Sequence, residues 1–292
     1  MTRRRAAWVF VGPALAVIGV FFFLPVVAAL GLSFTDFDIY ALANLANLRF
    51  VGLRNYIELL QRAEFWNALG NTLYFVLVGV PLSIGASLGT ALLLNARAAR
   101  FKAFFRTALF APVVTTLVAA AVVWRYLFNT RYGWLNYALG ALGVPAIDWL
   151  GDPHFSMPAI IVFAVWKNFG YNMVILLAGL QAIPEELYEA ARIDGASAWR
   201  RFVHVTLPML APMLSMVAIL TVAGYFQLFA EPYVMTQGGP LQSTVSVLYL
   251  MYEEGFKWWN LGSASAVAFV LFALMFAVTG AQLSLVRRRG PR

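Results

Sequence analysis

Charge, cysteine and histidine are all scarce in this sequence. Only 12% of its 292 residues are charged, whereas 62% are hydrophobic. Soluble domains have about 25% charged and about 45–50% apolar residues, so the composition excludes a water-soluble fold and predicts an integral membrane protein. The absence of cysteine excludes a disulfide framework, a thiolate nucleophile and a cysteine-based metal site.

Catalytic and ion-coupling side chains are missing from the apolar runs. The two histidines, His154 and His204, lie outside them, and no G-x-S-x-G pattern occurs, which argues against an intramembrane hydrolase. No Asp or Glu lies inside a run, which argues against an ion-coupled secondary transporter, the main alternative. The sequence also lacks G-x-x-x-x-G-K-[ST], so no nucleotide site of its own is expected.

What the sequence does contain is six long apolar runs. A helix that crosses a bilayer needs about 20 mostly apolar residues. The runs predict an all-α integral membrane protein, a single domain over residues 1–292, with six transmembrane helices at about 8–32, 69–93, 105–128, 157–180, 209–230 and 265–286. The first run is longer than the apolar core of a signal peptide, so an uncleaved helix is predicted.

Basic residues gather on one side of these spans. That side contains Arg3, Arg4, Arg5, Arg97, Arg100, Lys102, Arg106, Arg192, Arg200, Arg201, Arg287, Arg288, Arg289 and Arg292. The other side has only Arg49, Arg54, Arg62, Arg131 and Lys257. The positive-inside rule therefore places both termini in the cytoplasm. The net charge of +8 then reflects orientation and lipid contact, not nucleic-acid binding.

The loop between the fourth and fifth spans, residues 181–208, is unusually polar, and we call it the foot. Pro184 can begin a short helix. Gly195 is placed to end that helix in a left-handed conformation, and Ser197 can cap a second one. The second helix would have one apolar stripe, formed by Trp199, Phe202, Val203 and Thr206. These signals predict a helix–turn–helix that either docks another protein or lies on the membrane surface.

The foot resembles the cytoplasmic docking motif of the membrane subunits of ABC importers, which reads E-A-A, D-G-A, Phe and L-P. The matching residues are Glu189, Ala190, Ala191, Asp194, Gly195, Ala196, Phe202, Leu207 and Pro208. Other segments resemble the permeases of the maltose and multiple-sugar importers: Phe50–Tyr56, Leu177–Ala191, Val234–Phe256 and Leu261–Phe269. The resemblance thus extends over nearly the whole chain.

This resemblance implies a type I ABC importer transmembrane domain in the bacterial cytoplasmic (inner) membrane. Such a subunit forms half of the pathway for a carbohydrate, whether sugar, oligosaccharide or polyol. Its implied partners are a second permease subunit, two ATPase subunits and an extracytoplasmic binding protein. ATP is bound by the partner, so no cofactor, metal or catalytic residue is expected in this chain. A permease for glycerol phosphate or another non-sugar solute remains open.

The resemblance also assigns roles to individual residues. The matched foot residues would couple the chain to the ATPase, with Arg192, Arg200 and Arg201 at the rim. The fourth and fifth spans would form the solute site, with candidates Lys167, Asn168, Tyr171, Tyr225 and Gln227. The last outer loop, with Gly238, Gly239 and Pro240, would face the pathway, although locally it indicates only a turn.

Lys167 is the one charged residue deep in a predicted span. It lies about ten residues into that span, or about 15 Å down at 1.5 Å per residue. Charged groups at such depth usually have a function. Lys167 could contact solute, pair with a partner subunit or reach a water-filled cavity. By itself it weakly favours an acidic solute. Arg125, at the outer end of the third span, is predicted to be an interfacial anchor.

Overall fold

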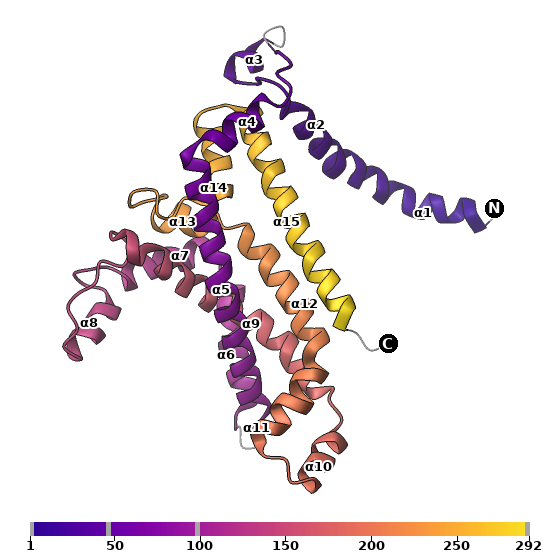
Figure 1. Cartoon of the computed structure of the whole chain (residues 1–292), viewed down its shortest axis with the longest axis vertical. Coiled ribbons are helices and arrows are strands. Elements are labelled where there is room, and N and C mark those ends of the chain that lie inside the picture. Colours follow the sequence, from indigo (N-terminus) through magenta and orange to yellow (C-terminus); the bar gives the residue numbers. More distant parts are fainter. Residues whose placement is uncertain (1–2, 45–47, 97–99, 290–292) are drawn as a thin grey trace. The chain divides into compact units, whose positions relative to one another are not determined.

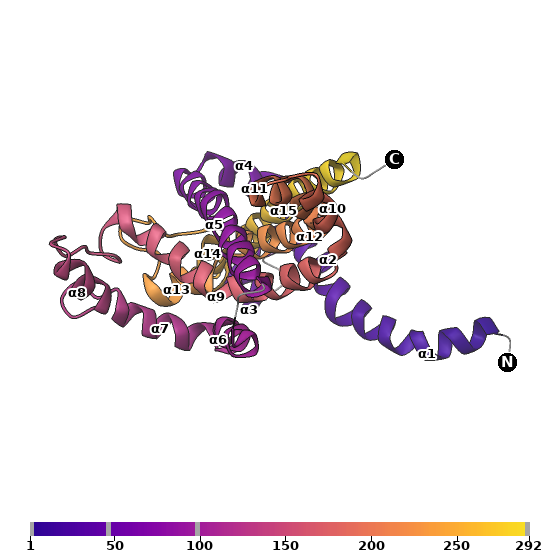
Figure 2. The same ribbon diagram turned by 90° about the horizontal axis from the view of Figure 1, so that it is seen from below.

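The computed structural model describes residues 3–44, 48–96 and 100–289, and within them the regular elements are helical (Figures 1 and 2). Arg97 and Arg292, which contribute to the predicted orientation, lie outside the described residues. The α-helices are α1 (Arg3–Ile18), α2 (Leu24–Leu32), α3 (Ile39–Ala43), α4 (Arg54–Gln61), α5 (Ala63–Asn95), α6 (Lys102–Val114), α7 (Leu117–Leu127), α8 (Trp134–Ala141), α9 (Pro153–Gln181), α10 (Glu185–Ile193), α11 (Ala198–Arg201), α12 (Leu207–Phe226), α13 (Ala230–Met235), α14 (Val247–Tyr252) and α15 (Leu261–Arg289). Within the described residues, three π-helical turns continue some of these helices: η1 (Gly19–Phe23), η3 (Phe202–Thr206) and η4 (Glu253–Lys257).

Membrane-spanning length is reached by five helical stretches of the described chain. They are Phe10–Leu32, Ala63–Asn95, Pro153–Gln181, Ala198–Phe226 and Leu261–Arg287. They correspond to the predicted first, second, fourth, fifth and sixth spans. The bent pair α6 and α7 supplies a sixth if it is counted as one span. The all-α, multi-span fold predicted from the sequence is therefore confirmed.

The predicted third span, residues 105–128, is not one helix. It is divided into α6 and α7, which meet at an angle of 100°. Thr115 and Thr116 form the break with an extended backbone, and β-branched residues fit a helix poorly. The Thr115 hydroxyl donates to the Pro112 carbonyl at 2.7 Å, which satisfies one of the free acceptors at the end of α6.

The fifth span begins earlier in the chain than predicted. α11, η3 and α12 form one uninterrupted helix from Ala198 to Phe226. Pro208 directly follows the start of α12 and lacks the N–H that a regular turn uses, and the wider π-helical turn before it accommodates this loss. The second helix of the foot is therefore the beginning of the span.

The chain forms two compact units, of which one contains the N-terminal segment up to Trp66 together with Leu250–Leu274. In this unit the Asn55 amide donates to the Ser33 and Thr35 carbonyls, each at 2.8 Å. Arg62 pairs with the largely buried Glu254 at 2.7 Å. The polar stretch after the first span is thus a folded hydrogen-bonded segment.

The second unit contains Asn67–Tyr249 together with the end of α15. Its buried apolar core joins α5, α9 and α12, and consists of Ala91, Leu94, Met173, Leu176, Leu177, Leu180, Ile183, Leu210 and Val217. α9 also packs against α6 and α7, and α7 against α13 (Figure 2). Gly170 permits a close approach of α9 to α6, because a Cβ there would lie 2.4 Å from the Leu109 carbonyl oxygen. This unit contains both the foot and the predicted solute residues.

Candidate functional site

The turn of the foot has the local geometry that the sequence predicts. Gly195 has φ = +73°, in the region that glycine adopts without strain. Its N–H donates to the Arg192 carbonyl at 3.0 Å, and the Ala196 N–H donates to the Ala191 carbonyl at 2.9 Å. These two bonds are a Schellman motif, which closes α10. The Ser197 side chain then accepts from the Arg200 N–H at 3.3 Å and caps α11.

Internal contacts fasten the foot to the core of its unit. The Tyr188 and Thr206 hydroxyl groups lie 3.0 Å apart and connect its two helices. Tyr188 and Val205 pack against the core between α5, α9 and α12. Arg192, predicted at the rim, pairs with Glu185 at 3.0 Å on the exposed surface. The foot is therefore a folded extension of α9 and α12.

The tip of the foot presents apolar side chains to the outside. Ile193 is 87% exposed and Trp199 is 70% exposed. The sequence predicts one apolar stripe that contains Trp199 and Thr206, but Thr206 is buried whereas Trp199 is exposed. The π-helical turn η3 explains the difference, because its wider turn changes the 3.6-residue period on which the stripe depends. Among the matched residues, Glu189, Ala190, Asp194, Gly195 and Pro208 are exposed, whereas Ala191, Ala196 and Phe202 are half-buried.

A cavity of about 480 Å³ lies in the same unit. Four of the five predicted solute residues line it: Asn168, Tyr171, Tyr225 and Gln227. The remaining lining residues are Phe75, Val113, Leu117, Asn172, Leu220, Thr221, Gly224, Leu228, Phe229, Ala230, Glu231 and Leu248. Helices α5, α9 and α12, which are far apart in the sequence, thus bring aromatic rings and amide groups together around this cavity.

Tyr225 and Asn172 form the ordered wall of this cavity. The Tyr225 ring stacks on Phe75 with centroids 4.8 Å apart. The Asn172 amide donates to the Thr221 hydroxyl at 2.9 Å and connects α9 to α12. The Tyr225 hydroxyl group is buried beside the buried Ser83 hydroxyl group and the Asn168 amide.

Lys167 has a different place from its four companions. Its side chain is buried, and its ammonium donates to the carbonyl oxygens of Pro112 at 2.7 Å and Val113 at 3.1 Å. Those carbonyls belong to the end of α6, where a helix concentrates partial negative charge. Lys167 therefore stabilises the end of α6 at the break, and it does not line the cavity.

Glu231 is a cavity residue that the sequence reasoning missed. It lies in α13, just beyond the fifth span, and is partly exposed at the cavity wall. Burial raises the pKa of its carboxyl group, while the Glu231 and Phe229 backbone N–H groups and the Lys167 charge oppose that rise. The only sequence feature that could have identified Glu231 as a cavity residue is its position next to Pro232 at the end of a span.

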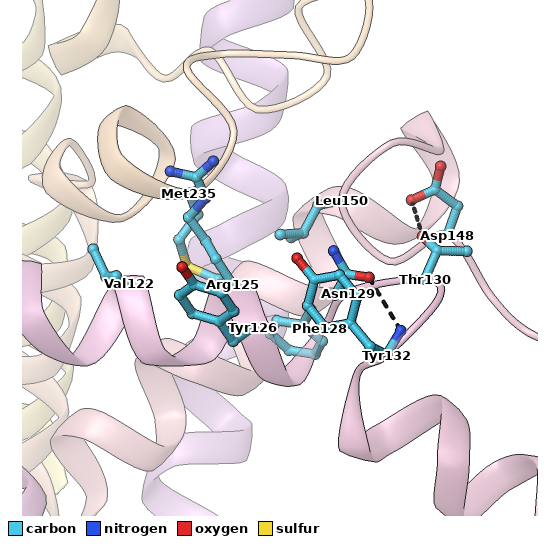
Figure 3. Close-up of a pocket in the computed structure, with 10 residues that line it drawn as sticks. All are labelled: Val122, Arg125, Tyr126, Phe128, Asn129, Thr130, Tyr132, Asp148, Leu150 and Met235. Carbon is cyan, nitrogen blue, oxygen red and sulfur yellow. Dashed lines mark hydrogen bonds between the residues drawn. The ribbon is translucent and has the colours of Figure 1, made fainter.

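A second cavity of about 360 Å³ lies between α7 and the segment that follows it. Figure 3 shows Arg125 beside Met235, and Thr130 beside Asp148. The Thr130 hydroxyl donates to Asp148 at 2.9 Å. Arg125 donates to the Val234 carbonyl over a long 3.4 Å. Arg125 therefore connects α7 to α13, the helix that carries Glu231.

The loop with Gly238, Gly239 and Pro240 does not line the larger cavity. Gly238 has φ = +81°, and a Cβ there would lie 2.9 Å from a Val245 methyl group. The Asn71 amide donates to the Gln242 and Val245 carbonyls, each at 2.9 Å. The loop is thus a turn tied to α5, in which Gly238 is buried and Leu241 is exposed.

Comparison with known proteins decides the family of the chain. The sequence profile of the family described as "Binding-protein-dependent transport system inner membrane component" matches residues 96–290. The chain belongs to this family. A membrane component of this kind is a transport subunit and not itself an enzyme.

Two relatives are similar to this membrane component over almost its whole length. The lactose transport system permease protein LacF of Rhizobium radiobacter is 38% identical over 275 residues, which cover 93% of this chain and 90% of the relative. The trehalose/maltose transport system permease protein MalF of Thermococcus litoralis is 36% identical over 288 residues, which cover 98% and 95%.

A solved structure shows the same fold. It is a bacterial alginate ABC transporter in complex with an alginate pentasaccharide-bound periplasmic protein. The TM-score is 0.84 at 18% identity, and the match covers 98% of this membrane component and 95% of the other chain. The predicted type I importer fold is therefore confirmed.

Proposed function

We propose that this chain forms half of the translocation pathway of an ABC importer for a carbohydrate. The observation that carries the proposal is the single helix from Ala198 to Phe226, which joins the foot directly to the cavity wall. The foot is one end of this helix, and Thr221 and Tyr225 are at the other. A movement of the foot is therefore a movement of the cavity wall.

The tip of the foot suits a protein partner better than a membrane surface. Its apolar side chains, Ile193 and Trp199, are exposed beside charged Glu189, Arg192 and Asp194, a mixture typical of a docking surface. The partner that this importer family requires is a cytoplasmic ATPase. The foot residues Glu189, Ala190, Ala191, Asp194 and Gly195 would enter a cleft on it, with Arg192 and Arg200 at the rim. This assignment places both termini in the cytoplasm, as the distribution of basic residues predicts.

The larger cavity has the side chains that a carbohydrate needs. The ring of Tyr171 is half-exposed, and aromatic rings offer a flat apolar face to a sugar ring. The amides of Asn168 and Gln227 are exposed and can both donate to and accept from hydroxyl groups. The two sugar-transport relatives support this solute class. A second permease subunit would complete the pathway, and an extracytoplasmic binding protein would deliver the solute.

The experiment is co-purification followed by transport. The chain is tagged at its C-terminus and extracted from native membranes in a mild detergent, and the proteins that accompany it are identified. We expect an ATPase with a phosphate-binding loop and a second membrane subunit, and ATP-dependent sugar uptake after reconstitution with the binding protein. Isolation of the chain alone, together with solute uptake that needs no ATP, would contradict the proposal and favour a secondary transporter.

A further inference from the structure

The larger cavity has an uneven distribution of charge. Among the described residues that line it, Glu231 is the only Asp, Glu, Lys or Arg. The remaining lining is aromatic, aliphatic, amide or hydroxyl. The one ionisable side chain that is not a phenol is therefore a carboxyl group, although the composition of the whole chain is basic.

The nearest candidate for a compensating cation is already engaged. Lys167 lies one residue before the cavity residue Asn168, but its ammonium donates to the Pro112 and Val113 carbonyls. Releasing it would remove the charged donor from the end of α6 and leave the Pro112 carbonyl with the Thr115 hydroxyl group only. The Lys167 charge acts on Glu231, but its donors are directed at the end of α6. An anionic solute in the cavity would thus lose its hydration without a hydrogen bond from this cation, which is costly.

The same wall is well suited to hydroxyl groups. The Asn168 and Gln227 amides line the cavity with Glu231, whereas the Tyr225 hydroxyl group is buried beside Ser83 and Asn168. A carboxylate accepts hydrogen bonds only, and it can accept from two neighbouring hydroxyl groups. The bond from Arg125 to the Val234 carbonyl holds α13 in place.

We infer that Glu231 contacts the solute and sets its charge class: it accepts hydrogen bonds from the hydroxyl groups of an uncharged carbohydrate, and the cavity disfavours phosphorylated, sulfonated and uronic solutes. This inference rests on the proposed function. It reverses the preference that Lys167 suggests when the sequence is considered alone, and it argues against a glycerol phosphate substrate.

The test measures binding to the purified permease–ATPase complex without the binding protein, so that only the membrane cavity selects the solute. Saturation-transfer NMR reports weak binding of three matched probe pairs: lactose and lactobionate, maltose and maltobionate, and trehalose and trehalose 6-phosphate. The variants are Glu231→Gln, which removes the charge, Glu231→Asp, which keeps it, and Tyr225→Phe, which removes only a hydroxyl group. Glu58→Gln is the matched control, because Glu58 is an exposed carboxylate outside the cavity lining.

In the unmodified complex, we expect at least one neutral probe to bind roughly tenfold better than its acidic counterpart. Glu231→Gln should weaken binding of the neutral probe by roughly tenfold, since bonds to charged acceptors are the strong ones, and should bring the neutral-to-acidic ratio close to one. Tyr225→Phe, which removes a buried hydroxyl group but no charge, should preserve the ratio. Glu231→Asp should also preserve the ratio, and Glu58→Gln should change neither quantity.

Two results would overturn the inference. Only the second of them would also contradict the proposed carbohydrate pathway. If neutral sugars bind but Glu231→Gln and Glu58→Gln leave the same ratio, Glu231 does not select the solute, and the proposed carbohydrate pathway stands. If the complex retains ATPase activity and binds neither the six probes nor other neutral monosaccharides, oligosaccharides and polyols, the carbohydrate pathway fails as well. Thermal unfolding, followed by tryptophan fluorescence, should have the same midpoint in all complexes, which would show that the variants are folded.

Discussion

The contacts within the foot join residues that are close in the sequence, whereas the contacts around the larger cavity join residues that are far apart. In the foot, the bonds from Arg192 to Glu185 and from Tyr188 to Thr206 join residues 7 and 18 positions apart. Among the helices that surround the cavity, Lys167 reaches Pro112 across 55 positions, and Asn172 reaches Thr221 across 49. The foot can therefore keep its shape while helices move, whereas the cavity changes shape whenever they do.

The largest expected effect is a loss of stability when a long-range contact near the cavity is removed. Lys167→Met should leave the end of α6 without its charged donor and lower the free energy of unfolding by about 2–4 kcal/mol. Melting of the purified complex, followed by tryptophan fluorescence, measures the change. Lys167→Arg keeps a charged donor and is the matched control. A Lys167→Met complex that melts like the unmodified one would show that the end of α6 is satisfied without this bond.

The next effect concerns the approach of α6 to α9. Gly170→Ala introduces a Cβ 2.4 Å from the Leu109 carbonyl oxygen, so one helix backbone has to shift, at a cost of about 1–3 kcal/mol. Gly89→Ala in α5 is the matched control, because nothing lies within 4 Å of its added Cβ. Melting curves should separate the two variants. Equal stability would show that the two helices move apart easily.

A change within the foot should weaken the coupling between ATP hydrolysis and solute uptake. Gly195→Asp adds a Cβ at a positive φ, which costs about 1–2 kcal/mol, and adds a charge at the tip. We expect ATP-driven uptake to fall by roughly tenfold or more, a loss equivalent to about 1.4 kcal/mol, while the complex stays assembled. Gly195→Asn adds a similar side chain without the charge and should lose less. Normal uptake in Gly195→Asp would remove the coupling role of the turn.

The smallest effect is expected at the cap of α11. Ser197→Ala removes the acceptor for the Arg200 N–H and should cost about 1 kcal/mol. Hydrogen exchange at the Arg200 and Arg201 amides should rise in this variant, without any change in binding of sugar. Ser284→Ala, which removes only an exposed bond within α15, is the control. Unchanged exchange would show that η3 holds α11 without its cap.

The same contrast explains what the sequence could predict. Gly195 and Ser197 were assigned correctly because a turn and a cap depend on the residues beside them. The partner of Lys167 could not be identified, because a backbone carbonyl has no signature in the sequence. Glu231 lies outside every predicted span, and only the return of the chain after α12 brings it to the cavity. Pro112 and the Thr115–Thr116 pair are the sequence features that favour a break in the predicted third span.

The uninterrupted helix from Ala198 to Phe226 also acts as a lever. Its 29 residues correspond to about 43 Å at 1.5 Å per residue. If the foot end were held, a tilt of about 10° would carry the far end through about 8 Å, from the same geometry. A modest rotation at the tip of the foot is thus enough, mechanically, to open or close the wall formed by Thr221 and Tyr225.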